Sequence, residues 1–363
     1  MSRSFGAMAT VRTTLGVILK DIYRYVPAIF LPGQGYLRIC NRSERLRRSP
    51  DGSGYVCDWR WTSDLHAPKF IPALGRLLMK KALADHSVTL ADAAPLGVTP
   101  PEVSFIIGHR GMSRLPHLLA TLRSIAAQRG AAVECIVVEQ DVISQLGPHL
   151  PIWVRLVHTP PPSSDMPYCR SWAFNIGARH ARSAVLVLHD NDLLVPMDYA
   201  AHLVNRVLQG YEVVNLKRFI FYLTQAHTEA VFDGRAGLSD SAPDVIVQNT
   251  EGGGSIAITR VGFDQIGGMD ESFIGWGGED NEFWERAQTV RMWPWGNLQL
   301  VHLWHAAQPG KLDTEHHTAL HYRDLEKINP RARIARLGAR PKGLLSGPIG
   351  DDGGGTGATN GGA

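Results

Sequence analysis

The sequence predicts an α/β fold in which a mostly parallel sheet is flanked by helices. Short apolar runs alternate with segments of helical periodicity, and polar clusters follow directly after several of the runs. The chain has 363 residues, of which 44% are hydrophobic and 20% charged, so it can bury a large core. This composition is typical of a soluble globular protein.

The predicted elements follow one another along the chain. Residues 103–107 form a continuous apolar run, as in a strand buried on both faces. Apolar residues at helical spacing then predict a helix over 115–126. The next elements are strands at 133–138 and 154–157, a helix containing Arg170, Asn175 and Gly177, and a strand at 184–188. This alternation implies a parallel sheet with right-handed crossovers.

Polar residues stand at the carboxyl ends of these strands, where ligands bind in parallel sheets. The first strand ends in Gly108-His109-Arg110-Gly111, the second in Glu139-Gln140-Asp141, and the run at 184–188 leads into Asp190-Asn191-Asp192. Two carboxylates at a strand end suit Mg²⁺ or Mn²⁺, with diphosphate oxygens as further ligands. A solvated turn is the alternative.

Two histidines lie in residues 298–305, which are predicted as a strand. On a strand, residues three apart face opposite sides, so we expect only one of His302 and His305 to join the aspartates. A hydrogen-bonded core histidine is the alternative for each of them.

The most distinctive stretch is glycine-rich and runs from Gly252 to Asp280. It contains Gly252-Gly253-Gly254, Ile266-Gly267-Gly268-Met269-Asp270-Glu271 and Gly275-Trp276-Gly277-Gly278-Glu279-Asp280. Glycines allow positive φ and close approach of a ligand, and an adjacent tryptophan can stack on a sugar ring. An acid on a fixed turn is a candidate general base. A turn with a buried tryptophan and acids at a helix N-terminus is the alternative.

The ends of the chain differ from its middle. Residues 1–98 carry 14 Lys and Arg against 7 Asp and Glu, and we interpret them as a basic N-terminal extension. This region either contacts an anionic membrane or acidic substrate, or is simply solvated. A catalytic domain is expected over 99–335, and the Gly-rich tail at 336–363 is predicted to be disordered.

Two further features limit the possibilities. No stretch has the roughly 18 uninterrupted apolar residues of a transmembrane helix. The four cysteines lie far apart without CxxC pairing, which favours a reducing compartment over a disulfide framework.

The stretch from Gly252 to Asp280 resembles the carboxyl-terminal catalytic segment of the β-1,4-galactosyltransferases, and it is similar to the corresponding parts of polypeptide N-acetylgalactosaminyltransferases and bacterial chondroitin-type polymerases. These are metal-dependent glycosyltransferases of the GT-A fold, and the resemblance spans residues 103–323. Asp190-Asn191-Asp192 resembles the DxD metal motif of the family. Ile106-Ile107-x-x-Arg110 resembles its first-strand motif, and Arg170-x-x-x-Phe174-Asn175-x-Gly177 the stretch before DxD.

The resemblance implies roles for the matched residues. Asp192 would bind the metal, with Asp190 on the nucleotide-sugar side. His305 matches the metal histidine, and His302 stands where galactosyltransferases have a methionine ligand. The residues expected to bind the nucleotide sugar are His109, Arg110, Arg114, Glu139, Arg170, Asn175, Asp190 and Trp276. Those expected on the acceptor side are Gly253, Gly254, Trp276 and Glu279, and Asp280 matches the catalytic base, with Glu279 beside it.

The expected function is therefore metal-dependent, inverting transfer of a Gal, GalNAc or GlcNAc-type sugar from a UDP-sugar to an acceptor hydroxyl, with Mn²⁺ or Mg²⁺ as cofactor. Retaining relatives carry Asn at the position of Asp280. The alternatives are a non-catalytic carbohydrate- or nucleotide-sugar-binding protein and a sugar-nucleotide pyrophosphorylase. We expect a bacterial cytoplasmic enzyme of polysaccharide biosynthesis without a nucleic-acid partner, whose basic N-terminal region is the part suited to peripheral membrane contact.

Overall fold

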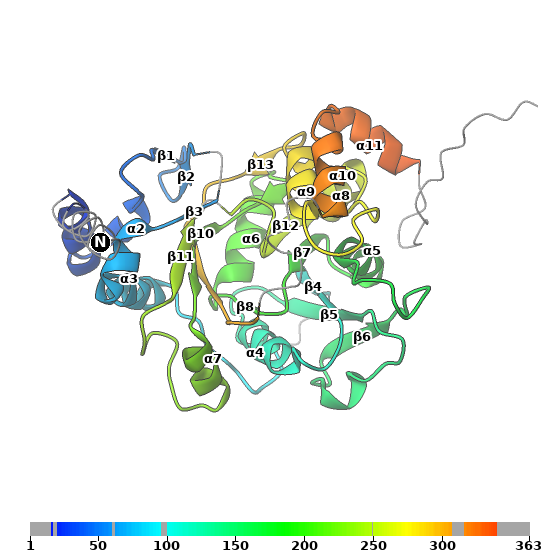
Figure 1. The fold of residues 1–363 in the computed structure, drawn as a ribbon, viewed down its shortest axis with the longest axis horizontal. Helices are drawn as coiled ribbons and strands as arrows, with labels where there is room; N and C mark the ends of the chain where they lie inside the picture. Colours follow the sequence, from blue (N-terminus) through cyan, green and yellow to red (C-terminus); the bar gives the residue numbers. More distant parts are fainter. Residues whose placement is uncertain are drawn as a thin grey trace, which may run out of the picture.

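The computed structural model of the chain describes residues 20–59, 62–95, 100–248, 250–306 and 316–339, together with residue 16. Two sheets lie beside each other in the middle of the molecule, and helices surround them (Figure 1). The sequence predicts a Gly-rich tail over 336–363, but residues 336–338 belong to the helix α11 Pro330–Gly338, in which Leu337 is buried; the residues from 340 onward lie outside the described part of the chain.

The larger sheet has seven strands in the order β13-β9-β12-β7-β4-β5-β6. Their bounds are β4 Val103–His109, β5 Val133–Glu139, β6 Val154–His158, β7 Val185–His189, β9 Val213–Val214, β12 Ser255–Thr259 and β13 Met292–Trp293. Strand β4 pairs in parallel with β5 and β7, and β5 pairs in parallel with β6. Strand β12 runs antiparallel between β7 and β9. The predicted α/β class with a mostly parallel sheet is confirmed.

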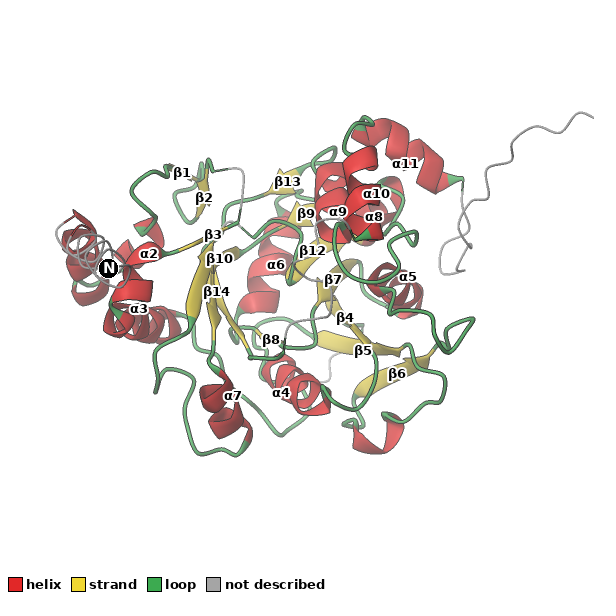
Figure 2. Ribbon diagram, viewed as in Figure 1, coloured by secondary structure: helices red, strands yellow, loops and turns green. Residues whose placement is uncertain are grey.

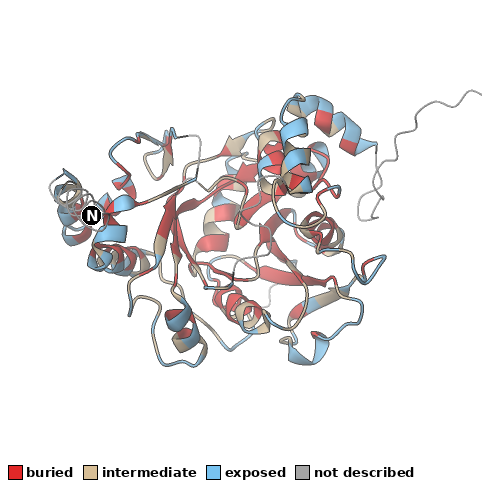
Figure 3. Ribbon diagram, in the orientation of Figure 1, coloured by how far each residue is buried: buried red, intermediate tan, exposed pale blue. Residues whose placement is uncertain are grey.

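Side chains of β4 alternate between two cores. Phe105 and Ile107 belong to the core on one face of the sheet, and Ile106 to the core on the other. Because both faces are covered, the strands are continuously apolar, and Figure 3 shows them buried beneath exposed outer helices. The helices of the first face are α4 Leu115–Ala126 and α6 Tyr199–Leu208; those of the second are α5 Arg170–His180, α8 Arg260–Gln265 and α9 Glu279–Ala287.

The smaller sheet has five strands in the order β3-β11-β10-β14-β8, which Figure 2 shows beside the larger sheet. Their bounds are β3 Ser63–Asp64, β8 Leu193–Leu194, β10 Lys217–Tyr222, β11 Val245–Gln248 and β14 Leu298–His302. Strand β14 is parallel to β10 and antiparallel to β8, and His302 is opposite Leu193. This pairing brings the end of β14 next to Asp192, the residue that precedes β8.

The N-terminal region packs against the smaller sheet. Leu78 and Met79 of α3 share a buried core with Phe219, Phe221 and Val301 of that sheet. Its elements are a helix over 20–30, the 3₁₀ helix η1 Gly35–Arg38, the strands β1 Leu46–Arg48 and β2 Tyr55–Cys57, and the helices α2 His66–Phe70 and α3 Pro72–Asp85. The remaining elements are the 3₁₀ helix η2 Gly147–His149 and the helices α7 Gln225–Phe232, α10 His317–Leu325 and α11 Pro330–Gly338. None of the helices in the described ranges has the length and apolar character needed to cross a bilayer.

Candidate active site

The polar clusters after β4 and β7 and the glycine-rich stretch meet in one cavity of about 1420 Å³. They meet there because parallel strands end at the same edge of the sheet, and because Asp190 N–H donates to the Gly254 carbonyl across 2.8 Å. Of the site residues predicted from the sequence, all except Glu139 and Asn175 line this cavity.

Asp192 and both histidines form one group of potential metal ligands. His305 Nε2 lies 3.3 Å from Asp192 Oδ2, and His302 Nε2 lies 3.6 Å from Asp192 Oδ1. One ligand atom from each of the three lies within 4.8 Å of the other two. The expectation that only one histidine would reach Asp192 is wrong. Strand β14 ends at His302, so His305 lies beyond the strand and the alternation of side chains no longer applies to it.

Arg114 provides positive charge within this group. Its Nη1 is 2.8 Å from Asp192 Oδ2 and its Nη2 is 2.9 Å from His305 Nδ1. Burial acts to raise the pKa of Asp192, but the two imidazoles and the guanidinium hold that pKa below its usual range. Arg114, predicted to bind the nucleotide sugar, therefore stands directly beside the metal-ligand candidates.

Tyr222 supports this group and was missed in the sequence. Its ring stacks on His302 with 4.1 Å between centroids and 18° between planes, because β10 places Tyr222 opposite His302. The strand β10 begins with Lys217 and Arg218, which interrupt its apolar pattern, so its pairing with β14 could not be predicted from the sequence.

Arg170 connects three other acids that line the cavity. Its Nε and Nη2 lie 2.9 and 2.6 Å from Asp190 Oδ1, and its Nη1 contacts Asp280 Oδ1 and lies 3.7 Å from Glu279 Oε1. Asp190 was also predicted as a metal ligand. In the structure its carboxylate is directed to Arg170, and it is not part of the group formed by Asp192 and the histidines.

Glu279 and Asp280 differ in environment although they are neighbours at the start of α9. Burial, followed by the charge of Asp280, raises the pKa of Glu279 to about 7. The side chain of Glu279 is 9% exposed, whereas that of Asp280 is 33% exposed. Within the described structure, Glu279 Oε2 is buried without a hydrogen-bond partner. Glu279 thus keeps its proton to a higher pH than an ordinary glutamate does.

The glycines before β12 make room for Asp280. A Cβ on Gly252 would lie 2.7 Å from the Asp280 carbonyl oxygen, and one on Gly253 would lie 3.1 Å from Asp280 Oδ2. Gly254 has a φ of +81°, which favours glycine. The close approach expected at these glycines is therefore an approach of their backbone to the N-terminus of α9. Because Gly253 has no side chain, Oδ2 of Asp280 has space beside the backbone of that residue.

Trp276 presents its side chain at the cavity. It is 43% exposed and lines the cavity, as the predicted stacking platform requires. The loop around it is fixed on both sides, because the Gly275 N–H donates to the Tyr168 carbonyl at 2.9 Å and the Thr318 hydroxyl donates to the Trp276 carbonyl at 2.5 Å.

His109 and Arg110 line the cavity, but both also hold the surrounding loops. His109 Nε2 donates to the Gly111 carbonyl at 2.8 Å, so its Nδ1 accepts from the Asn191 amide at 2.8 Å, and burial lowers the pKa of His109. Arg110 Nη1 donates to the Met166 carbonyl at 2.5 Å. The end of β4 is thereby joined to the aspartate loop through Asn191 and to the loop before α5 through Met166.

Glu139 and Asn175, predicted to bind the nucleotide sugar, have other roles. Glu139 accepts hydrogen bonds from the Gln145 and Leu146 N–H groups at 2.7 and 3.1 Å, so its carboxylate orders the loop after β5. Asn175 is 2% exposed, and its amide exchanges hydrogen bonds of 2.9 Å with both the carbonyl and the N–H of Met269. It thereby holds the Gly-Gly-Met turn.

The chain was then compared with known proteins. Residues 242–293 match a family model described as the N-terminal domain of galactosyltransferase. The matched segment is that of a glycosyltransferase. The match includes Gly252 to Asp280, so it confirms the family resemblance and the enzyme class that this stretch predicted. No match was found among the curated proteins.

Among solved structures, the chain is similar to a Drosophila β-1,4-galactosyltransferase 7 in complex with xylobiose, with 18% identity, a TM-score of 0.32, and coverage of 61% of this chain and 83% of that one. It is also similar to GalNAc-T7 with UDP, GalNAc and Mn²⁺, with 15% identity, a TM-score of 0.38, and coverage of 57% and 45%. A Pyrobaculum calidifontis mannosyltransferase with GDP-Man and Mn²⁺ has 17% identity, a TM-score of 0.37, and coverage of 76% and 75%. Such scores reflect partial backbone overlap.

Proposed function

We propose that this glycosyltransferase is metal-dependent and inverting, and that it moves a sugar of the Gal, GalNAc or GlcNAc type from a UDP-sugar to an acceptor hydroxyl. The observation that carries the proposal is that two distinct groups line one cavity. Asp192, His302 and His305 form a group of potential metal ligands, and Glu279 and Asp280 gather at Arg170, with Trp276 in the same lining. A donor diphosphate at the first group would leave its sugar in the cavity that the second group also lines.

The residues of the first group fit a divalent cation. In the described part of the chain, the buried Asp192 Oδ1 accepts no hydrogen bond, and burial lowers the pKa of His305, which favours the neutral, metal-binding imidazole. Two imidazoles and one carboxylate suit a transition metal such as Mn²⁺ better than Mg²⁺, which prefers oxygen ligands. A cation bound there would supply Lewis-acid stabilisation of the leaving diphosphate.

The protein's own cations would contribute beside the first group. Arg114 reaches Asp192 and His305, so a diphosphate at this point would be within the reach of its guanidinium. Planar guanidinium groups bind phosphate oxygens through two parallel hydrogen bonds. Arg110 lines the cavity as well, and its contact with the Met166 carbonyl keeps its charge at the carboxyl end of β4.

Asp280 is the proposed base. Arg170 orients the carboxylate through Oδ1, while Oδ2 lies toward Gly253 and is the atom that would take the proton of the acceptor hydroxyl. Trp276 would hold the acceptor sugar through its apolar face. The hydroxyl oxygen then attacks the anomeric carbon opposite the leaving diphosphate, which gives inversion.

The first test is a donor screen. The full chain is incubated with a panel of UDP-sugars and Mn²⁺, with and without EDTA, and released UDP is measured. We expect one donor to be hydrolysed or transferred, and EDTA to abolish the reaction. Loss of the base should lower turnover about 10²- to 10⁴-fold. We therefore expect Asp280→Asn to keep Mn²⁺-dependent UDP binding and lose turnover, and Asp192→Asn to lose both.

Asp324→Asn is the matched control, because Asp324 is an exposed carboxylate paired with Lys327 and does not line the cavity. Near-normal turnover in Asp280→Asn would refute the base assignment. UDP binding that is unchanged in Asp192→Asn would refute the metal site. Binding of a UDP-sugar without any turnover on a broad acceptor panel would favour the alternative of a non-catalytic binding protein.

A further inference from the structure

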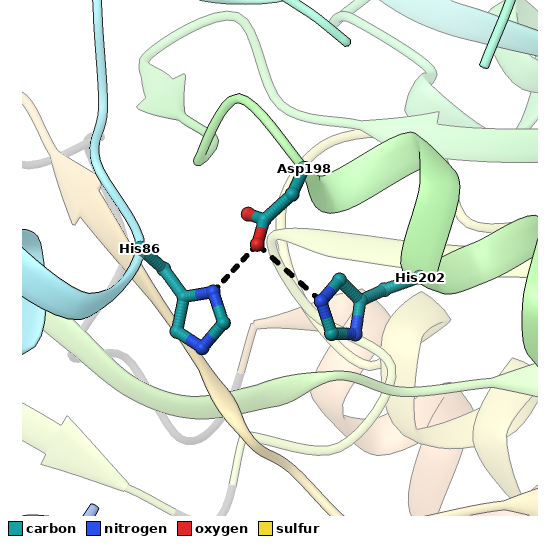
Figure 4. A group of neighbouring side chains, drawn as sticks. All are labelled: His86, Asp198 and His202. Carbon is teal, nitrogen blue, oxygen red and sulfur yellow. Dashed lines mark hydrogen bonds and ion pairs between the residues drawn. The ribbon is translucent and has the colours of Figure 1, made fainter. Parts of the chain in front are cut away.

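A second group of histidine and aspartate side chains lies outside the candidate active site. Figure 4 shows His86, which follows α3, and His202 of α6 directed at the same oxygen of Asp198. His86 Nδ1 is 2.6 Å from Asp198 Oδ2, and His202 Nε2 is 3.3 Å from it. One ligand atom from each residue lies within 4.8 Å of the other two, and none of the three residues lines the active-site cavity.

The orientation of Asp198 is unusual for its place in the fold. Asp198 is the N-cap residue of α6, where an aspartate normally accepts a hydrogen bond from a backbone N–H of the first helical turn. Its side chain makes no such bond and instead turns to the two imidazoles. Considering the described residues alone, its other oxygen, Oδ1, is buried and has no hydrogen-bond partner. The carboxylate thus has capacity for a further positive ligand.

The outer nitrogens of both imidazoles face side-chain amides. Gln34 Nε2 is 3.2 Å from His86 Nε2, and Asn297 Nδ2 is 3.4 Å from His202 Nδ1. When an imidazole binds a metal through one nitrogen, the other carries hydrogen and needs an acceptor. Rotation of each amide by 180° would place an oxygen there, and Asn297 Oδ1 has no hydrogen-bond partner of its own among the described residues.

We propose that His86, Asp198 and His202 form a second metal site, for a divalent ion of the zinc type, which fastens the N-terminal region to the catalytic domain. Two imidazoles and one carboxylate are ligands that Zn²⁺ accepts, with water as a fourth. Bonds of about 2.0–2.1 Å in a tetrahedral arrangement place ligand atoms about 3.3 Å apart. The pair of His202 and Asp198 already has this spacing. The distance from His86 Nδ1 to Asp198 Oδ2 has to increase by about 0.7 Å, because the hydrogen bond between these atoms is replaced by a bond from each atom to the metal.

The backbone already holds the two parts of the site near each other. The Met197 N–H donates to the Ser87 carbonyl at 2.9 Å, one residue away from Asp198 and from His86. Gln299 of β14 donates to the Ala82 carbonyl at 2.9 Å and also to the His86 carbonyl. Since the ligands come from segments more than a hundred residues apart, a bound ion would stabilise the native chain and not the unfolded one.

The test uses the full chain carrying Asp192→Asn, so that the active-site group is disabled. After treatment with a chelator, zinc content is measured by mass spectrometry at equimolar Zn²⁺, and Tm is measured with and without Zn²⁺. We expect one zinc ion per chain and a rise in Tm of several degrees. Adding His202→Gln should abolish both effects, and adding His149→Gln, a change at an exposed histidine outside the site, should abolish neither.

The comparison is made within each variant, since His202→Gln also removes a hydrogen bond to Asp198 and lowers Tm by itself. If that variant does not fold, His86→Gln is used in its place, and visible absorption of Co²⁺ in the Asp192→Asn chain reports whether the ion is tetrahedral. Zinc uptake and a Tm rise that persist in both histidine variants would overturn the proposal. So would the absence of any zinc uptake by the Asp192→Asn chain.

Discussion

Replacing Glu279 by glutamine should stabilise the protein in a pH-dependent manner. Burial raises the pKa of Glu279 from 4.5 to about 7. The native protein therefore keeps the proton on Glu279 up to about pH 7, whereas the unfolded chain releases it near pH 4.5. Native stability contributed by this group is greatest below the unfolded pKa and is lost as the pH rises toward 7. Glutamine imitates the protonated form at every pH.

The magnitude follows from the pKa difference. At 1.36 kcal/mol per pH unit, an ionised Glu279 costs the native state about 3 kcal/mol above pH 7. Its side chain is only 9% exposed, so solvent screening is small. We expect Glu279→Gln to raise Tm by several degrees at pH 8 and to leave it nearly unchanged at pH 4.5.

Calorimetric melting of both proteins at the two pH values provides the assay. Asp324→Asn is the matched control, because it removes an exposed carboxylate remote from Glu279 in the chain and should leave Tm nearly unchanged at both pH values. An equal Tm change in Glu279→Gln at both pH values, or a lower Tm at pH 8, would refute the reasoning.

Three further substitutions test the site. Asn175→Ala removes the side chain that holds the Met269 turn, so we expect the free energy of unfolding in denaturant titration to fall by about 2–4 kcal/mol and the UDP affinity to stay unchanged. Weaker UDP binding in the folded variant would instead support a nucleotide-binding role for Asn175. Gly254→Ala places a Cβ at a φ of +81° and 3.2 Å from Leu193 Cδ2, so we expect a loss of about 1–3 kcal/mol, and an unchanged melting curve would contradict this. Tyr222→Leu removes the ring stacked on His302, so Mn²⁺ affinity measured by calorimetry should fall at least about tenfold, and equal affinity would exclude that support.

The larger sheet could be predicted from the sequence because its central strands are buried on both faces. Such strands appear as continuous apolar runs, and the parallel arrangement places their polar ends at one edge. For this reason Arg110 and Asp192 could be predicted at one edge of the sheet, whereas Trp276 and Asp280 were expected beside them because of the family resemblance. The prediction from strand ends is wrong for Glu139, which does not line the cavity. A strand end brings a residue near the edge, but the N–H groups of the following loop turned this carboxylate away from the cavity.

The smaller sheet could not be predicted in the same way. Its central strand β10 begins with two buried basic residues, Lys217 and Arg218, and the five strands of the sheet are spread over the chain from Ser63 to His302. Lys217 Nζ donates to the Glu251 carbonyl at 3.0 Å, and burial lowers its pKa to about 7. Without knowledge of this sheet, neither the joint approach of His302 and His305 nor the stacking of Tyr222 can be derived.

The shared core between the N-terminal region and strand β14 has an evolutionary consequence. Apolar side chains of α3 pack in the same core as Val301, next to His302 at the end of that strand. A descendant that lost α3 would expose Phe219 and Phe221 and would loosen the strand that positions a metal-ligand candidate. Helix α3 is therefore not a module that can be exchanged between enzymes, and it has to be inherited together with the sheet that it covers.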